Sequence, residues 1–194
     1  MASPRRRLHF ICHPLMDTVL DIQRLCADLE QRDISRSVFL ERCAKLVPAA
    51  ISCSRAGVWL FQGEKPALRM HCLVMYDAVG RRMTNVPDEE GPPVSDYFLA
   101  LEQTGYVIAA DVRLHFATAG FFEQWLKVND VRSLLAAAFS INGQLFGAFT
   151  CAQVGVPAEW SRSQLSTLRS IGSRASLALA NSDRTATETQ PGLL

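Results

Sequence analysis

The first periodic stretch of the chain has apolar residues three or four positions apart, at Leu15, Val19, Ile22, Cys26 and Leu29. This spacing places them on one stripe of an amphipathic helix. Polar residues occupy most of the positions between them, which is typical of a helix with one buried side.

A second helix follows a short polar break. Asp33 and Ser35 can accept hydrogen bonds from the first free N–H groups of a helix. Pro48 is expected to kink or end this helix, because proline has no N–H to donate. The apolar positions of the helix are Val38, Phe39, Cys43, Leu46 and Val47.

Two pairs of strands are predicted farther along. Residues 56–61 and 68–76 are rich in β-forming side chains, and the turn-like segment 62–66 joins them into a hairpin. Residues 132–141 and 144–153 form a second hairpin around Asn142-Gly143. An Asn-Gly pair suits a two-residue type I′ turn, since both residues tolerate positive φ.

The segment between the hairpins is less regular. Residues 81–94 are polar and contain Gly91-Pro92-Pro93, so we expect a loop there. A short helix over 96–104, a strand over 106–110 and a helix over 118–128 are predicted next.

The last predicted element is a long helix that begins at a Ser161-x-x-Gln164 capping box. Its apolar stripe consists of Leu165, Leu168, Ile171, Ala175 and Leu179. We therefore expect a flexible arm over residues 1–14, a single domain over 15–181, and a disordered polar tail over 182–194.

This order of elements favours an α+β fold. Antiparallel hairpins flanked by terminal helices predict a central antiparallel sheet of five to six strands. The N- and C-terminal helices would pack on one face, with short helices and loops over the other. The second face can then hold a pocket beneath the middle segment.

Composition narrows the function classes. Lys and Arg number 20 and Asp and Glu 19, so the net charge of +1 provides no field that would attract nucleic acid or an anionic membrane. The longest apolar run, 134–139, is far too short to span a bilayer. Because polar residues interrupt the apolar stretch after Arg5-Arg6-Arg7, we predict a cytoplasmic protein without a signal peptide.

The 6 cysteines have no CxxC spacing and lie mostly in apolar runs, so we expect reduced core thiols. No HExxH, GxSxG or GxxxxGK[ST] motif occurs. The sequence therefore predicts no enzymatic activity.

Residues 36–181 resemble a GAF domain, and no single motif carries this resemblance. It depends on the order of several stretches, namely Phe39-Leu40-Glu41-Arg42, residues 54–61, residues 107–112, the closing hairpin through Asn142-Gly143, and Trp160 with the final helix. The resemblance implies a sensory or regulatory module of a bacterial signalling protein, which commonly pairs through its terminal helices.

Three GAF subfamilies do not match at their characteristic residues. Bilin-binding members attach their tetrapyrrole to a cysteine, whereas Arg113-Leu114-His115-Phe116 contains none and Ala152 replaces a second histidine. The Asn-Lys-x-Phe-Asp-Glu signature of cyclic-nucleotide GAF domains is absent. Cys53, Cys72 and Cys151 do not follow the cysteine pattern of the free methionine sulfoxide reductases. The ligand and any cofactor are therefore left open.

Five candidate binding residues lie in the middle segment. Asp111 can accept hydrogen bonds from a ligand, or it can cap the following turn. His115 can contact a ligand or stand exposed in a loop. Phe121, Phe122 and Trp125 can wall an apolar pocket or belong to the core.

Tyr97, Ser133 and Thr150 complete the candidate ligand-binding set. Tyr97 opens the segment expected to roof the pocket, and the two hydroxyl residues lie on facing strands of the second hairpin. Either hydroxyl can point into a cavity or be satisfied within the sheet.

Two functional hypotheses follow. In the first, a small molecule binds over the sheet and shifts the terminal helices. In the second, the chain is a ligand-free dimerisation or docking module, whose stripes pack between subunits as a four-helix bundle that Leu168→Asp would dissociate. A polar tail follows the last helix, so the output would lie on a partner or elsewhere in a longer protein.

Overall fold

The computed structural model describes residues 14–63, 69–84, 86, 89–90 and 92–188. The arm predicted over residues 1–14 therefore lies almost wholly outside the described residues, as do the turn at 64–66 and the last six residues of the predicted tail.

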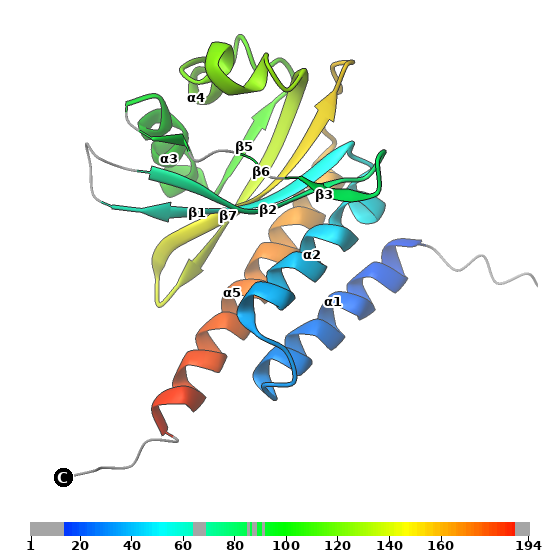
Figure 1. Cartoon of the computed structure of the whole chain (residues 1–194), viewed down its shortest axis with the longest axis vertical. Coiled ribbons are helices and arrows are strands. Elements are labelled where there is room, and N and C mark those ends of the chain that lie inside the picture. Colours follow the sequence, from blue (N-terminus) through cyan, green and yellow to red (C-terminus); the bar gives the residue numbers. More distant parts are fainter. Residues whose placement is uncertain (1–13, 64–68, 85, 87–88, 91, 189–194) are drawn as a thin grey trace, which may run out of the picture.

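One antiparallel sheet forms the centre of the fold (Figure 1). Six strands follow the order β3-β2-β1-β7-β6-β5, and a short strand, β4, also pairs with β2. This confirms the predicted α+β architecture. The strands are β1 (Arg55–Gln62), β2 (Arg69–Asp77), β3 (Arg82–Thr84), β4 (Glu89–Glu90), β5 (Tyr106–Ala109), β6 (Val131–Ile141) and β7 (Gln144–Val154).

The second hairpin has the predicted turn. Asn142 and Gly143 adopt φ angles of 52° and 80°, and Ile141 pairs with Gln144 on either side of them. Strand β1 then pairs with β7, which brings the two hairpins into one sheet. Both β-hairpins therefore belong to a single sheet.

The loop predicted over 81–94 is partly wrong. Strands β3 and β4 both pair with β2 in this segment, and α3 begins at its end, at Pro92. These pairings are made by backbone groups at the edge of the sheet, so the polar side chains of the segment gave no indication of them.

Two helices, α2 (Arg36–Ile51) and α5 (Arg162–Glu188), cover one face of the sheet, and α1 (Pro14–Glu30) packs on their outer side (Figure 1). Ser35 caps α2 by accepting a hydrogen bond from Val38 N at 3.3 Å. The capping box of α5 is formed by Gln164 N donating to Ser161 Oγ at 3.2 Å and Ser161 N donating to Gln164 Oε1 at 2.8 Å.

Helix α2 continues beyond Pro48. It ends at Ile51, where Ser52 takes a left-handed φ of 60° and donates its N–H to Pro48 O at 2.8 Å. The proline therefore lies in the last turn of the helix, close to the predicted end.

Helix α5 extends to Glu188, beyond the predicted end at residue 181. Asn181 Nδ2 donates to Glu30 Oε1 at 2.9 Å, and Arg36 donates to Ser182 Oγ at 3.3 Å. These polar contacts attach the last turns of α5 to α1 and α2. The sequence suggested a tail because the contacts do not use apolar side chains.

The middle segment covers the opposite face with α3 (Pro92–Thr104), α4 (Phe116–Ala119) and a π-helical turn, η1 (Phe122–Leu126). The single helix predicted over 118–128 is therefore divided. The division follows Gly120, and Phe121 leaves the helical region with φ −112°. The π-turn buries Phe121, Trp125 and Leu126 together against the sheet.

Candidate functional site

The sheet face beneath the middle segment has small side chains at its centre. We call Gly57, Ala136, Ala148 and Thr150 the floor; in the sheet Thr150 pairs with both Gly57 and Ala136. A Cβ atom on Gly57 would lie 2.7 Å from Met75 Cε, so only glycine allows Met75 to pack this closely. The small floor residues leave space for large side chains above them.

Three aromatic residues of the middle segment fill that space. Tyr97, Phe121 and Trp125, here called the roof, are all buried. The Tyr97 and Phe121 rings meet edge to face at 5.6 Å and 86°, and Trp125 meets Trp59 of β1 at 5.3 Å and 89°. These are favourable aromatic geometries, and they pack roof and floor into one apolar cluster.

Two polar atoms inside this cluster have no hydrogen-bond partner. They are Tyr97 Oη and Trp125 Nε1. Burial raises the pKa of the Tyr97 hydroxyl, which therefore remains protonated and able to donate. Buried Tyr and Trp side chains usually find a partner for these groups. Trp160 Nε1 is also unpartnered, but it lies in the core beneath the terminal helices.

Asp111 interacts with its own turn. Its Oδ1 accepts a hydrogen bond from Arg113 N at 2.9 Å, and its Oδ2 lies 2.6 Å from Arg113 Nη2. The hydrogen bonds from Arg113 lower the pKa of the Asp111 carboxyl to about 2. The structure therefore shows the turn-capping arrangement, one of the two alternatives for this residue.

His115 caps α4. Its Nδ1 accepts a hydrogen bond from Ala117 N at 3.2 Å, and its ring stacks on Phe116 at 5.0 Å. The ring is half-buried, and desolvation lowers the pKa of His115 below its ordinary value of 6.5.

We expect protonation of His115 to destabilise the folded chain. Only an unprotonated Nδ1 can accept the bond from Ala117 N, so the folded chain binds this proton less readily than the unfolded chain. The stabilisation is therefore complete above about pH 6.5 and is lost as the pH falls below that value. His115→Asn keeps a capping acceptor but removes the titration. Urea unfolding between about pH 5 and pH 8 should show a weaker pH dependence in the variant; parallel curves would contradict this explanation.

The three remaining candidate residues lie in different parts of the fold: Ser133, Thr150 and Phe122. Ser133 Oγ accepts a hydrogen bond from Ala158 N at 2.9 Å and so fixes the segment that precedes α5. Thr150 Oγ1 donates to Gly57 O at 3.4 Å within the floor. Phe122 is half-buried and borders a hollow of about 100 Å³ together with Asp111. Roof and floor thus bring together Tyr97, Phe121, Trp125 and Thr150.

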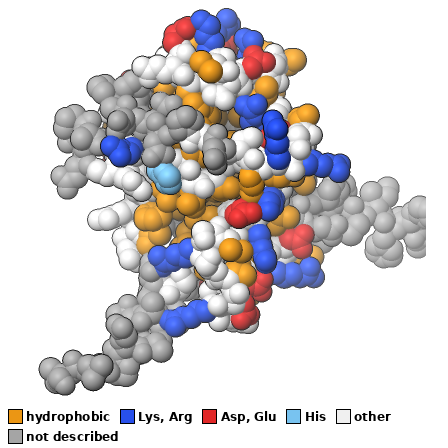
Figure 2. All heavy atoms as spheres, viewed as in Figure 1, with side chains coloured by type: hydrophobic (Ala, Val, Ile, Leu, Met, Phe, Trp, Pro, Cys, Tyr) orange, Lys and Arg blue, Asp and Glu red, His pale blue; other side chains and the backbone are white. Residues whose placement is uncertain are grey.

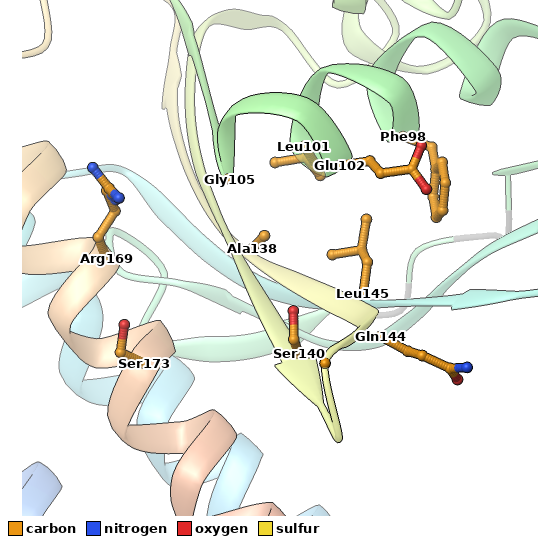
Figure 3. A pocket seen from close by; sticks show the side chains of 11 residues that line it. Phe98, Leu101, Glu102, Gly105, Ala138, Ser140, Gln144, Leu145, Arg169 and Ser173 are labelled. Atoms are coloured by element: carbon orange, nitrogen blue, oxygen red, sulfur yellow. The ribbon is translucent and has the colours of Figure 1, made fainter.

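The sequence interpretation missed two features. Trp59 was not among the candidate binding residues, yet it contacts the roof directly. A cavity of about 580 Å³ between α3, the β6–β7 hairpin and α5 was not foreseen (Figure 3). The only sequence indication of this cavity was the short strand after Gly105 beside the much longer strand of the second hairpin.

The described cysteines, Cys26, Cys43, Cys53, Cys72 and Cys151, are all free thiols. Burial raises the pKa of the Cys43 and Cys151 thiols, which disfavours the reactive thiolate.

Within the described part of the chain, no three potential metal ligands lie together. No helix there is long and apolar enough to cross a bilayer. On the surface seen in Figure 2, acidic and basic side chains are interspersed.

The sequence profile of the GAF domain family matches residues 35–179, which is most of the chain and includes both hairpins and the roof. The chain belongs to the GAF domain family. In this GAF domain, the matched region begins at Ser35, the N-cap of α2, and ends within α5.

Solved GAF domains share the fold. The blue-light-absorbing form of the PixJ GAF domain of Thermosynechococcus elongatus has a TM-score of 0.69 at 21% identity, with 82% of this chain and 92% of that chain covered. A phycoerythrobilin-bound GAF domain from a cyanobacterial phytochrome has a TM-score of 0.68 at 14% identity, with 87% and 97% covered.

The Stigmatella aurantiaca phytochrome photosensory core module has a TM-score of 0.67 at 13% identity, with 97% of this chain and 40% of that chain covered. At identities this low, the TM-scores establish a common fold alone. No curated protein matches the sequence of this GAF domain.

Proposed function

We propose that this GAF domain is a non-catalytic sensory module that binds a small molecule between roof and floor and responds through α1 and α5. The observation that carries the proposal is the pair of unpartnered polar atoms, Tyr97 Oη and Trp125 Nε1, inside one apolar cluster. A buried donor without a partner costs about 1–3 kcal/mol. A ligand with two acceptors would satisfy both atoms.

The roof is built in a way that permits rearrangement. Trp125 belongs to a single π-helical turn and Phe121 immediately precedes it, next to a four-residue helix. Such turns often occur at functional sites. Roof and floor are closely packed in this structure, so a ligand would bind an arrangement in which the roof has moved away from the floor. Its differential affinity for that arrangement would supply the response.

The path to the terminal helices runs through the sheet. Thr150 of the floor and Cys151 are consecutive on β7 and belong to opposite faces, because Cys151 packs in the core beneath α1, α2 and α5. Ser140 N also donates to Ser176 Oγ of α5 at 2.9 Å. A shift of the strands that carry the floor would therefore be transmitted directly to α5.

The first test requires no ligand. If Tyr97 Oη is unsatisfied in the free chain, Tyr97→Phe should raise the free energy of unfolding by about 1 kcal/mol. Tyr76 of β2 is half-buried, so Tyr76→Phe is the matched control and should change the free energy of unfolding little. Urea unfolding measures both. A loss of stability in Tyr97→Phe would show that the hydroxyl is already satisfied, and would remove the main support for the proposal.

The second test is a thermal-shift screen of metabolites, nucleotides, haem and tetrapyrroles. Tetrapyrroles are included because solved relatives carry bilins; covalent attachment is not expected, since no cysteine lies between Leu73 and Thr150. Tyr97→Phe and Trp125→Phe should reduce the shift caused by a binder, and Trp160→Phe, which removes the same type of donor from the other core, should not. A screen without binders, or a shift equal in all variants, would contradict ligand binding in this site.

The alternative proposal is a ligand-free dimerisation module. For this role, α1 and α5 expose less apolar surface than their apolar stripes in the sequence suggested. Leu168 is buried within the chain, so Leu168→Asp would unfold the domain and is the wrong test. The stripe of α5 packs against the sheet, and the stripe of α1 packs against α2 and α5. Leu177, which is 62% exposed on α5, is the better probe. A dimer that light scattering detects in the free chain and that Leu177→Asp dissociates would favour this alternative.

A further inference from the structure

The cavity of about 580 Å³ lies where strand β5 stops short of the end of β6. Tyr106, the first residue of β5, pairs with Ala137, whereas β6 continues to Ile141. The edge of β6 beyond this point has no neighbouring strand. Helix α3 borders it on one side and α5 on the other (Figure 3).

This edge is not suited to a further strand. Ala138 N already donates to Gly105 O at 2.9 Å, and Ser140 N donates to Ser176 Oγ at 2.9 Å. An added strand needs free N–H groups along the edge. The cavity volume instead lies within the roughly 300–1,000 Å³ that is typical of small-molecule sites.

The end of the cavity next to α5 is polar. Arg169 and Ser173 lie one helical turn apart on α5, and Ser140 of β6 lies nearer the middle of the cavity (Figure 3). The guanidinium Cζ lies 5.5 Å from the centre of the Tyr106 ring. A ring below the guanidinium plane positions the cation while its in-plane N–H donors stay available.

Arg169, which is exposed on α5, is not one of the arginines of the described chain held in an ion pair. Arg113 and Arg132 form ion pairs with Asp111 and Asp130. Among the described residues, no carboxylate lies within ion-pair distance of Arg169. Its charge is thus available to an anion in the cavity.

The opposite end of the cavity is largely apolar. Leu101 and Phe98 of α3 and Leu145 of β7 line it, and Ala138 lies between the two ends (Figure 3). The Glu102 side chain is at this end, near Phe98 (Figure 3). A carboxylate there disfavours a second negative charge on the ligand.

We propose that this cavity binds a small organic monocarboxylate with an apolar body. The carboxylate accepts hydrogen bonds from Arg169 and from the Ser173 hydroxyl, and the body packs on Leu101 and Leu145. The site is separate from the one between roof and floor. Its ligand contacts α3, the β6–β7 hairpin and α5 together, so binding would restrain the position of α5 against the sheet.

The test uses phenylacetate, benzoate and hexanoate as probes in calorimetric titrations of the full chain. We expect at least one to bind saturably, with a Kd of about 10 μM to 1 mM for a site this open. Uncharged phenylacetamide has nearly the same shape as phenylacetate. It should bind at least about tenfold more weakly than the carboxylate, because charge-assisted hydrogen bonds are lost.

Variants assign the binding to this cavity. Arg169→Gln should weaken binding at least about tenfold. Arg162→Gln, at an equally exposed arginine of the same helix that does not line the cavity, should leave binding unchanged. Tyr97→Phe should also leave it unchanged, which separates this site from the roof and floor. Circular dichroism confirms that each variant is folded. The proposal is overturned if no probe saturates below about 5 mM, if the amide binds as well as the acid, or if Arg162→Gln weakens binding as much as Arg169→Gln.

Discussion

Replacing Gly147 by alanine is expected to lower the free energy of unfolding by at least about 3 kcal/mol. Gly147 lies in β7, between Leu60 of β1 and Phe139 of β6. A Cβ atom here would overlap the Trp59 carbonyl oxygen and lie 2.6 Å from Phe139 Cζ. The backbone oxygen cannot move without breaking the pairing of β1 with β7, so the two central strands would have to separate.

Gly80→Ala is the control for this prediction. The atoms nearest to a Cβ on Gly80 are Asp77 Oδ2 at 3.2 Å and Arg82 Nε at 3.3 Å, both at the ends of flexible side chains. The Arg82 side chain can move aside, and a shift of a few tenths of an ångström lets the Asp77 carboxylate keep its hydrogen bonds from Val79 N and Gly80 N. The change should therefore remain within about 0.5 kcal/mol. Urea unfolding gives both values. Equal stability of the two alanine variants would mean that β1 and β7 are not packed as closely as the structure shows.

The second large effect is expected for Phe149→Ala. Phe149 is buried in the core beneath the terminal helices, and its ring lies 5.2 Å from that of Phe139. Truncating a fully buried phenylalanine costs about 3–5 kcal/mol, because apolar contacts are lost and a cavity remains. That loss is a large share of the total stability of about 5–15 kcal/mol for a domain.

Phe146→Ala on the same strand provides the comparison. Phe146 is 38% exposed, and its ring is farther from Phe139, at 6.0 Å. We expect a loss of about 1 kcal/mol. Chemical unfolding of the two variants at one pH measures the difference. Similar losses at both positions would contradict the burial that places the main core between β7 and the helices.

The elements themselves were largely predictable. The helix spacing before residue 50, the Ser161/Gln164 capping box and the Asn142-Gly143 turn are all found in the structure. Each of these patterns depends on residues within a few positions of one another. Their geometry is set by local sterics and hydrogen bonding, which the sequence displays directly.

The candidate site was only partly predictable. The aromatic residues Phe121 and Trp125 lie over the sheet as the middle segment suggested, but η1 and α4 replace one regular helix. Asp111 and His115 bond to backbone groups two residues away. A polar residue near a strand end is compatible with a ligand contact or a cap, and the sequence offered no means to choose between them.

The sequence by itself determined most of the helices and strands and which sides of them are apolar, but not β3, β4 or the division of the helix predicted over 118–128. Only the tertiary structure decided that β1 lies beside β7, that Leu168 is buried within one chain, and that Arg169 faces a cavity. Those outcomes depend on contacts between residues far apart in the chain. Each is fixed by how all the elements pack at once, because the closure of the sheet and the filling of its two faces are properties of the whole domain.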